Sequence, residues 1–271
     1  MVPSVLNISK KEAEPGFKYQ FAICTLVSNL EEYGRMLESF IEAGFVSDDC
    51  EYRYADNTNG NTFDAYSGIN QFLQNSDAKY IIICHQDILL KFDKRAELEH
   101  RIAELNAIDK NWAILGNAGT NNPYLLSMKI THADMVTHKV GVLPSRVNSL
   151  DENFILVKKS ANIALSGDLS GFHLYGTDIC LIASCLGYSA YAVEFSLLHL
   201  SMGRVDSSFY ALSEKLQVKY SFFFRSRYIK TTVTRFFLSS NGVLRYVMNI
   251  SLVKSVVRLV YKYKYKWFKK Y

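Results

Sequence analysis

Two potential metal ligands, His85 and Asp87, stand one residue apart where the apolar run "YIIIC" ends. The simpler explanation is a strand that ends in polar residues, with Asp87 capping the next turn. The alternative is a divalent-cation site at the carboxyl edge of a sheet. His199 closes another apolar segment, and Asp178 opens a predicted helix without a nearby basic residue. A core histidine and a helix-dipole aspartate would explain these two separately. All four lie at the ends of elements that should converge, which favours a common site.

The elements that must position these side chains alternate between two periodicities. Strands are predicted at 19–29, 50–60 and 79–87, and helices at 30–44 and 65–78. This order is typical of an α/β unit with a mostly parallel sheet. Such sheets bind ligands beyond the carboxyl ends of their strands, where Asn29, Asp56 and Asp87 fall.

The middle of the chain continues the pattern without an internal repeat or a long linker. We expect helices at 93–108 and 177–188, a strand followed by a Gly-rich turn at 112–120, and strands within 121–149, at 153–160 and at 189–201. The candidate residues are therefore spread over one continuous domain.

Composition restricts the class of protein. The chain has 271 residues, of which 49% are apolar, so a substantial core is possible. Its five cysteines include no CxxC pair and mostly lie in apolar runs, as expected of reduced core residues in a cytosolic protein. The start lacks a secretory signal, and no run reaches the roughly 18 apolar residues of a spanning helix. We expect a protein that is neither exported by that route nor threaded through a bilayer.

The net charge of +5 conceals two regions of opposite sign. No Asp or Glu follows Glu214, whereas fourteen Lys and Arg do, so the charge is −9 up to Glu214 and +14 after it. Different partners are implied for the two regions. The predicted organisation is an N-terminal extension at 1–18, a main domain at 19–210 and a basic helical region at 211–271.

Seven short motifs then appear in a familiar order. They are "ICTLVSN", "YADNTNGN", "YIIICHQDILL", "WAILGNAGT", "SLDENFILVKK", "GFHLYGTDICLIASCLGY" and "VEFSLLHLSMG". In this order the chain, from Tyr19 to Gly203, resembles family-2 glycosyltransferases of the GT-A fold. It is most similar to the bacterial branch in which H-Q-D replaces D-x-D. The resemblance implies a Rossmann-like α/β fold, a nucleotide-sugar donor, a divalent cation and transfer to an acceptor hydroxyl.

The resemblance also implies roles for individual residues. On the donor side it points to Thr25, Ser28, Asp56, Asn57, His85 and Asn117. Asp87 and His199 would hold the metal, and Asp178 would be the catalytic base. Glu152 and His173 would lie on the acceptor side. Two acids before a strand are more often a solvated turn, and a loop histidine packed between Phe172 and Tyr175 explains His173 equally well. His85 replaces the first Asp of D-x-D, which leaves metal binding, ribose contact and loop shaping open for it.

The chemistry fits these residue types. Carboxylate oxygens suit Mg²⁺ or Mn²⁺, and an imidazole ligand favours Mn²⁺. A single displacement with Asp178 as base predicts inversion at the anomeric carbon. Thr177 stands where many relatives have a second acid, and no Q-x-x-R-W element follows, so we expect one sugar per encounter.

The basic region has the composition of a membrane-surface segment. Polar residues recur at helical spacing from 242 to 260, and "YKYKYKWFKKY" then adds lysines among aromatic residues. Such a helix would lie on an anionic membrane, at about 1 kcal/mol for each basic residue near the surface. A helix packed on the main domain is the structural alternative. Binding to nucleic acid is less favoured, because the rest of the chain is acidic and carries no recognised motif.

The sequence thus predicts a metal-dependent, inverting glycosyltransferase. It would work in the cytoplasm at the inner face of the cell membrane. There it would add a sugar to a glycan or lipid-linked acceptor during synthesis of a bacterial surface polysaccharide, such as lipopolysaccharide or capsule. The rival from another class is a catalytically silent GT-A-like protein that binds a glycan or scaffolds other enzymes. The substitutions at His85 and Thr177 keep that rival open.

Overall fold

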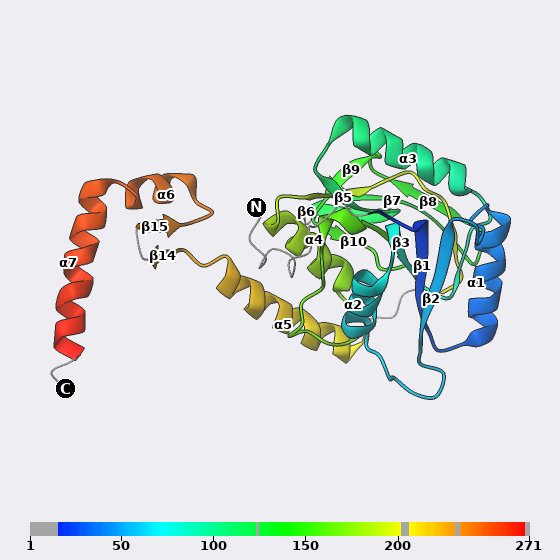
Figure 1. Ribbon diagram of the computed structural model, residues 1–271, viewed down its shortest axis with the longest axis horizontal. Helices are drawn as coiled ribbons and strands as arrows, with labels where there is room; N and C mark the ends of the chain where they lie inside the picture. Colours follow the sequence, from blue (N-terminus) through cyan, green and yellow to red (C-terminus); the bar gives the residue numbers. More distant parts are fainter. Residues whose placement is uncertain (1–15, 123–124, 202–205, 231–233, 269–271) are drawn as a thin grey trace, which may run out of the picture. The chain divides into compact units, whose positions relative to one another are not determined.

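The computed structural model describes residues 16–122, 125–201, 206–230 and 234–268, and it forms two compact units, Met1–Ser213 and Glu214–Tyr271 (Figure 1). Each unit is described by itself. Most of the predicted extension at 1–18 lies outside the described residues. The predicted limit at 210 stays a prediction.

A seven-stranded sheet forms the centre of the first unit, in the order β2-β1-β3-β11-β5-β12-β9. Its strands are β1 (Tyr19–Val27), β2 (Cys50–Asp56), β3 (Ala78–Cys84), β5 (Trp112–Gly116), β9 (Ser145–Val147), β11 (Phe154–Lys158) and β12 (Ser189–Ala192). Strands β9 and β11 run against their neighbours, and the other five share one direction. The sheet is mostly parallel, as the sequence predicts.

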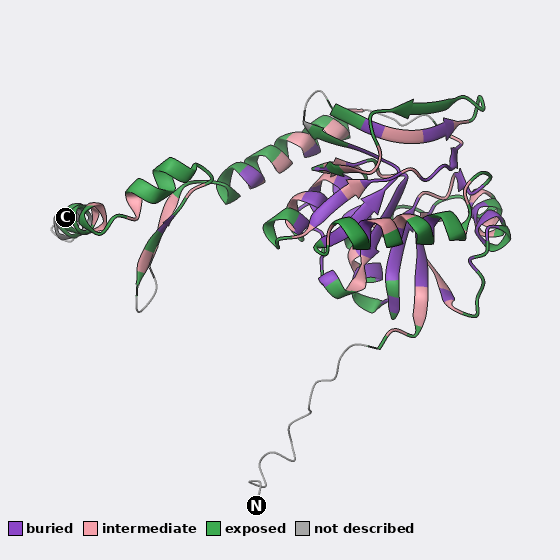
Figure 2. Ribbon diagram, turned by 90° about the horizontal axis from the view of Figure 1, so that it is seen from above, coloured by how far each residue is buried: buried purple, intermediate pink, exposed green. Residues whose placement is uncertain are grey.

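Helices flank this sheet, so the predicted α/β fold is confirmed (Figures 1 and 2). They are α1 (Leu30–Glu42), α2 (Ala65–Asn75), α3 (Arg95–Ile108) and α4 (Tyr175–Cys185). Helices α1 and α3 pack on one face, where Phe40 and Leu98 join Val27 in the core. Helix α2 lies on the other face, because its Gly68 meets Leu26, which alternates with Val27 along β1. The strands between the two helix layers are buried in Figure 2.

A second sheet adjoins the first, in the order β10-β6-β7-β13-β4, with β8 paired to β7. Its strands are β4 (Ile88–Leu89), β6 (Ala118–Asn122), β7 (Leu125–His132), β8 (Thr137–Val140), β10 (Ser149–Leu150) and β13 (Leu198–His199). The single strand predicted at 189–201 is wrong, because the chain changes sheet after Ala192 and forms two strands. At 112–120 the predicted strand is β5, and the predicted Gly-rich turn is the change of sheet at Asn117 and the start of β6.

The second unit contains the end of α5 (Ser207–Phe223), the hairpin of β14 (Arg227–Lys230) and β15 (Arg235–Leu238), and the helices α6 (Gly242–Met248) and α7 (Ser251–Phe268). The continuous helical pattern predicted from 242 to 260 is interrupted at Asn249. Its side-chain amide accepts from the Phe237 N–H at 2.9 Å and donates to the Phe237 carbonyl at 3.0 Å. Among the described residues, no helix is both long and apolar enough to cross a membrane. Residues 269–271 of the lysine-rich end lie outside the described part.

Candidate metal centre and adjoining cleft

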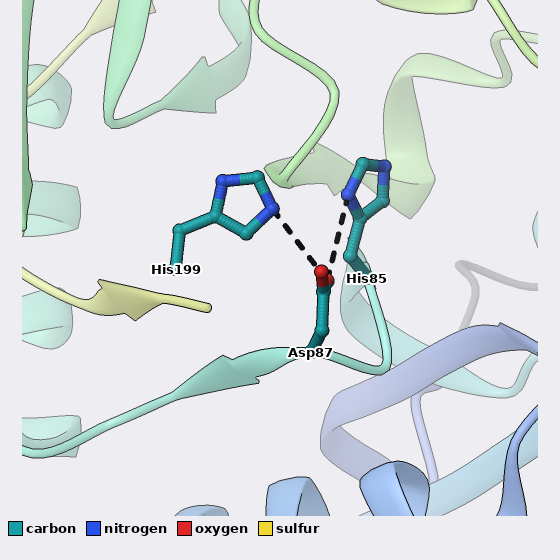
Figure 3. A group of neighbouring side chains, drawn as sticks. All are labelled: His85, Asp87 and His199. Atoms are coloured by element: carbon teal, nitrogen blue, oxygen red, sulfur yellow. Dashed lines mark ion pairs between the residues drawn. The ribbon is translucent and has the colours of Figure 1, made fainter. Parts of the chain in front are cut away.

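Three candidate residues converge on one point in the first unit. His85, Asp87 and His199 each offer a ligand atom, and these atoms lie within 4.8 Å of one another (Figure 3). His199 Nε2 is 3.5 Å from Asp87 Oδ1, and His85 Nδ1 is 3.9 Å from the same oxygen. This arrangement is a candidate metal centre.

Backbone pairing explains why residues more than a hundred positions apart meet. His85 and Asp87 lie in the turn between β3 and β4, and His199 pairs with Ile88 across β13 and β4. The N–H of Leu200 donates to the Asp87 carbonyl at 3.0 Å. The junction between the two sheets therefore sets the spacing of the three side chains.

The electrostatics of the centre favour a charged carboxylate at Asp87 and a neutral ring at His85. Burial alone would raise the pKa of Asp87, but hydrogen bonds from His199 and Ser201 and the nearby histidines hold it well below its ordinary value. Burial lowers the pKa of His85, and Asp87 opposes that effect. Ionised Asp and neutral His are the forms that bind metals.

The donor set fits a divalent transition metal. Two imidazoles and one carboxylate suit such a metal better than Mg²⁺, which prefers oxygen ligands. With three protein ligands, coordination positions are left for a ligand from solution. The sequence left three roles open for His85, and the geometry brings this residue to the centre.

A cleft of about 390 Å³ adjoins the centre at the carboxyl ends of β1, β2 and β3. Its lining includes the candidates Ser28, Asn57, His85 and Asp87, together with Leu26, Asn61, Ala65, Gln86, Phe172 and Tyr175. Its volume lies within the range of about 300–1,000 Å³ of small-molecule sites. Ligands of α/β sheets bind at this edge.

The other predicted donor residues do not line this cleft. Thr25 is buried, and its hydroxyl lies 3.5 Å from Cys84 Sγ. Asp56 is exposed, and its carboxylate accepts from the N–H and hydroxyl of Thr58, which lower its pKa. Asn117 is fully buried, and neither atom of its side-chain amide has a partner among the described residues. Asn57 does line the cleft, although its amide also holds both backbone groups of Phe63.

Gln86 is a structural residue that sequence reasoning overlooked. Its Oε1 accepts from the N–H groups of Ser28 and Asn29 at 2.8 and 3.0 Å. Its Nε2 donates to Ser28 Oγ and to Glu32 Oε2. The middle residue of H-Q-D thus connects the end of β3 to the end of β1 and the start of α1.

The structure places Asp178 in the interior. Its side chain is 0% exposed, and its carboxylate accepts from the N–H and the hydroxyl of Ser166 at 2.8 and 2.7 Å. In this arrangement no acceptor hydroxyl can reach it, and its predicted role as base stays a prediction. The motif alone does not indicate that Asp178 is buried.

Glu152 lies in the turn before β11, and its side chain contacts the start of α4. Its backbone is linked to the metal centre through Tyr175. The Tyr175 hydroxyl donates to the Glu152 carbonyl at 3.0 Å and lies 3.1 Å from His85 Nε2. Glu152 Oε1 accepts from the Gly176 N–H at 3.3 Å. Burial raises the pKa of Glu152 to about 8, and the N–H groups at the helix start oppose that rise only in part.

His173, the other predicted acceptor-side residue, lies on the loop before α4. Its carbonyl accepts from the Tyr66 hydroxyl at 3.1 Å, and its Nε2 is 3.9 Å from Asp206 Oδ1. Its ring lies edge-on to Phe209. The histidine therefore joins α2 to the start of α5, and it is absent from the cleft lining.

Glu152 should make stability depend on pH. Its folded-state pKa is raised, so between about pH 4.5 and 8 the folded state keeps a proton that the unfolded state has released. The free energy of unfolding should therefore fall as pH rises through this window, by up to about 1.4 kcal/mol per pH unit. Urea unfolding of the native chain and of Glu152→Gln, compared at several pH values, isolates this contribution. Identical pH slopes for the two proteins would contradict it.

The fold and the site define an α/β protein with a candidate metal centre beside a cleft at the carboxyl edge of its sheet. The chain belongs to the family of the Fuscovulum blasticum protein named "ATP synthase subunits region ORF 6". The two are 34% identical over 221 residues, which cover 79% of this chain and 89% of that protein. No family model matches the sequence.

Two solved structures show a lower similarity. A197 from STIV has a TM-score of 0.39 at 12% identity, over 69% of this chain and 98% of that one. Residues 1–349 of S. aureus TarS give a TM-score of 0.42 at 9% identity, over 67% of this chain and 60% of that one.

Proposed function

We propose that this protein is a metal-dependent glycosyltransferase, which moves one sugar from a nucleotide-sugar donor to an acceptor hydroxyl with inversion. The observation that carries the proposal is the convergence of His85, Asp87 and His199 beside a cleft at the ends of three strands. The order of the sequence motifs supports the same reaction.

The cleft offers places for the parts of such a donor. Ser28 and Asn57 border the side formed by β1 and β2, where the nucleotide would lie. His85, Asp87 and His199 would hold Mn²⁺ in preference to Mg²⁺ at the diphosphate. A bound cation supplies Lewis-acid stabilisation of the leaving diphosphate.

Two carboxylates compete for the role of base. Asp178 is the motif-based candidate, but it is closed off by Ser166. Glu152 is partly exposed, and its pKa of about 8 suits a general base near neutral pH. Its backbone carbonyl accepts from the Tyr175 hydroxyl, which lies 3.1 Å from His85 Nε2, so the residue is held near the metal centre. We therefore propose that Glu152 is the base that accepts the proton of the acceptor hydroxyl.

The setting of the reaction is also part of the proposal. The fourteen basic residues after Glu214 would attract an anionic membrane surface at the inner face of the cell membrane. A lipid-linked acceptor in bacterial surface polysaccharide synthesis suits that position. A silent scaffold at the same surface would share the charge, but it would have no use for a metal centre beside a cleft.

The test is a thermal-stability panel of UDP, GDP, CMP and dTDP sugars on the full chain, with and without Mn²⁺. One nucleotide class should raise the melting temperature only with the metal, since a ligand at 100 times its Kd stabilises by about 2.7 kcal/mol. Incubation with the stabilising donor should then release free nucleotide when an acceptor is supplied. If no donor stabilises the protein with any of Mn²⁺, Mg²⁺, Fe²⁺ or Zn²⁺, the scaffold is the better account.

A further inference from the structure

The second unit has an open cavity of about 780 Å³ between its hairpin and helix α7. Four arginines line it: Arg225, Arg227, Arg235 and Arg258. Apolar side chains, among them Phe237, Met248 and Val257, form the remainder of the lining. The cavity therefore combines concentrated positive charge with an apolar wall.

No acidic residue is among those that line this cavity. No Asp or Glu occurs after Glu214 in the sequence. Within the described residues, the side chains of Arg235 and Arg258 make no hydrogen bond or ion pair, while Arg227 donates to the Phe222 and Phe223 carbonyls. Four like charges around one cavity repel one another, so an anion in the cavity would be stabilised.

The apolar surface of the unit is also left uncovered. Among its described residues only Tyr220 and Phe237 are buried, at 7% and 9% exposure. Val243, Tyr246 and Leu252 are each about three-quarters exposed, at 75%, 75% and 74%. Exposed apolar surface on this scale marks a site of interaction with a protein or a lipid. The positive charge of the cavity beside its apolar wall favours a lipid with an anionic headgroup.

We propose that this cavity binds the phosphate headgroup of a single lipid molecule. Guanidinium groups form paired hydrogen bonds with phosphate oxygens, which here would come from Arg235 and Arg258. The wall at Phe237, Met248 and Val257 takes the first part of the lipid chains. This is a site of defined stoichiometry, in contrast to general attraction to a charged membrane. That the lipid is the carrier of the sugar acceptor rests on the proposed function, whereas binding of the lipid does not.

The experiment is calorimetric titration of the full chain at physiological salt with dihexanoyl phosphatidate, a soluble lipid with a phosphate monoester. Dihexanoyl phosphatidylcholine and inorganic phosphate are the comparison ligands. We expect one phosphatidate per chain, and binding at least about tenfold weaker for each comparison ligand. Phosphatidylcholine carries a phosphodiester whose charge is balanced by choline, and inorganic phosphate lacks the apolar chains. Inorganic phosphate that binds as tightly as the lipid would overturn the lipid part of the proposal.

Two double variants with equal loss of charge separate a site from diffuse attraction. Arg235→Gln with Arg258→Gln removes the two unpaired arginines of the cavity and should weaken phosphatidate binding about 10- to 100-fold. Arg245→Gln with Lys254→Gln removes charge outside this cavity and should leave binding within about threefold. Equal losses in the two variants, or no binding by the native chain, would overturn the site. Mn²⁺-dependent donor binding is measured in the same variants, so failure of the lipid site is distinguishable from failure of the proposed transferase.

Discussion

Asp87→Asn is expected to abolish the Mn²⁺-dependent part of donor binding and, with it, sugar transfer. Asn keeps the shape of the side chain but removes the charge that His85 and His199 face at 3.9 and 3.5 Å. Loss of a residue that merely orients a metal ligand costs about 10–100-fold in affinity. Loss of the carboxylate ligand itself should cost at least the upper part of that range. Titration with Mn²⁺, followed by the donor panel, measures both effects.

Asp48→Asn is the matched control for that variant. Asp48 is exposed and lies before β2, away from the metal centre, so the same chemical change should leave Mn²⁺ and donor binding as in the native chain. Undiminished Mn²⁺ affinity in Asp87→Asn would remove Asp87 from the metal centre and the cation from the proposed reaction.

Glu152→Gln should lower turnover by about 10²–10⁴-fold while leaving metal and donor binding intact, because removal of a general base affects the proton transfer alone. Turnover by the native protein should increase as the pH rises toward 8, because burial raises the pKa of Glu152 to about 8. The variant should lack this rise. Initial rates across the pH range, at saturating donor, measure both.

Asp178→Asn is the paired variant that decides between the two carboxylates. Its primary effect should be on stability, since Asn keeps only one of the two oxygens that accept from Ser166 and leaves one buried hydrogen bond unmade, at a cost of about 1–3 kcal/mol. Its turnover should stay close to native below the melting temperature. A fully folded Asp178→Asn that loses as much turnover as expected of Glu152→Gln would return the role of base to Asp178.

The fold was predictable because local patterns and global topology agree. The helical spacing after Asn29 ends where α1 ends, and Asn29 caps that helix by accepting from the N–H groups of Glu31 and Glu32. The carboxyl-edge position of Asp87 follows from the apolar run before it. Pairing of His199 with Ile88 was beyond reach, because it depends on a register between strands that no local pattern encodes.

The less predictable features share one physical cause, which is the change of the chain from one sheet to the other. An apolar run such as 189–201 reads as one strand whether or not it bends, and here it supplies both β12 and β13. The burial of Asn117 at a second such crossing follows in the same way. Side-chain exposure at motif residues is set by segments that the motif does not include, such as the loop at Ser166 for Asp178 and the start of α4 for Glu152.

Gln86 gives the H-Q-D segment a structural role in addition to the proposed metal binding. Its neighbours His85 and Asp87 face the metal centre, while its own amide holds the N–H groups of Ser28 and Asn29. These two residues are exposed, yet their amide protons should exchange slowly with solvent deuterium. These hydrogen bonds should hold the floor of the cleft and the candidate metal ligands in one rigid arrangement, whose geometry is set before a ligand binds.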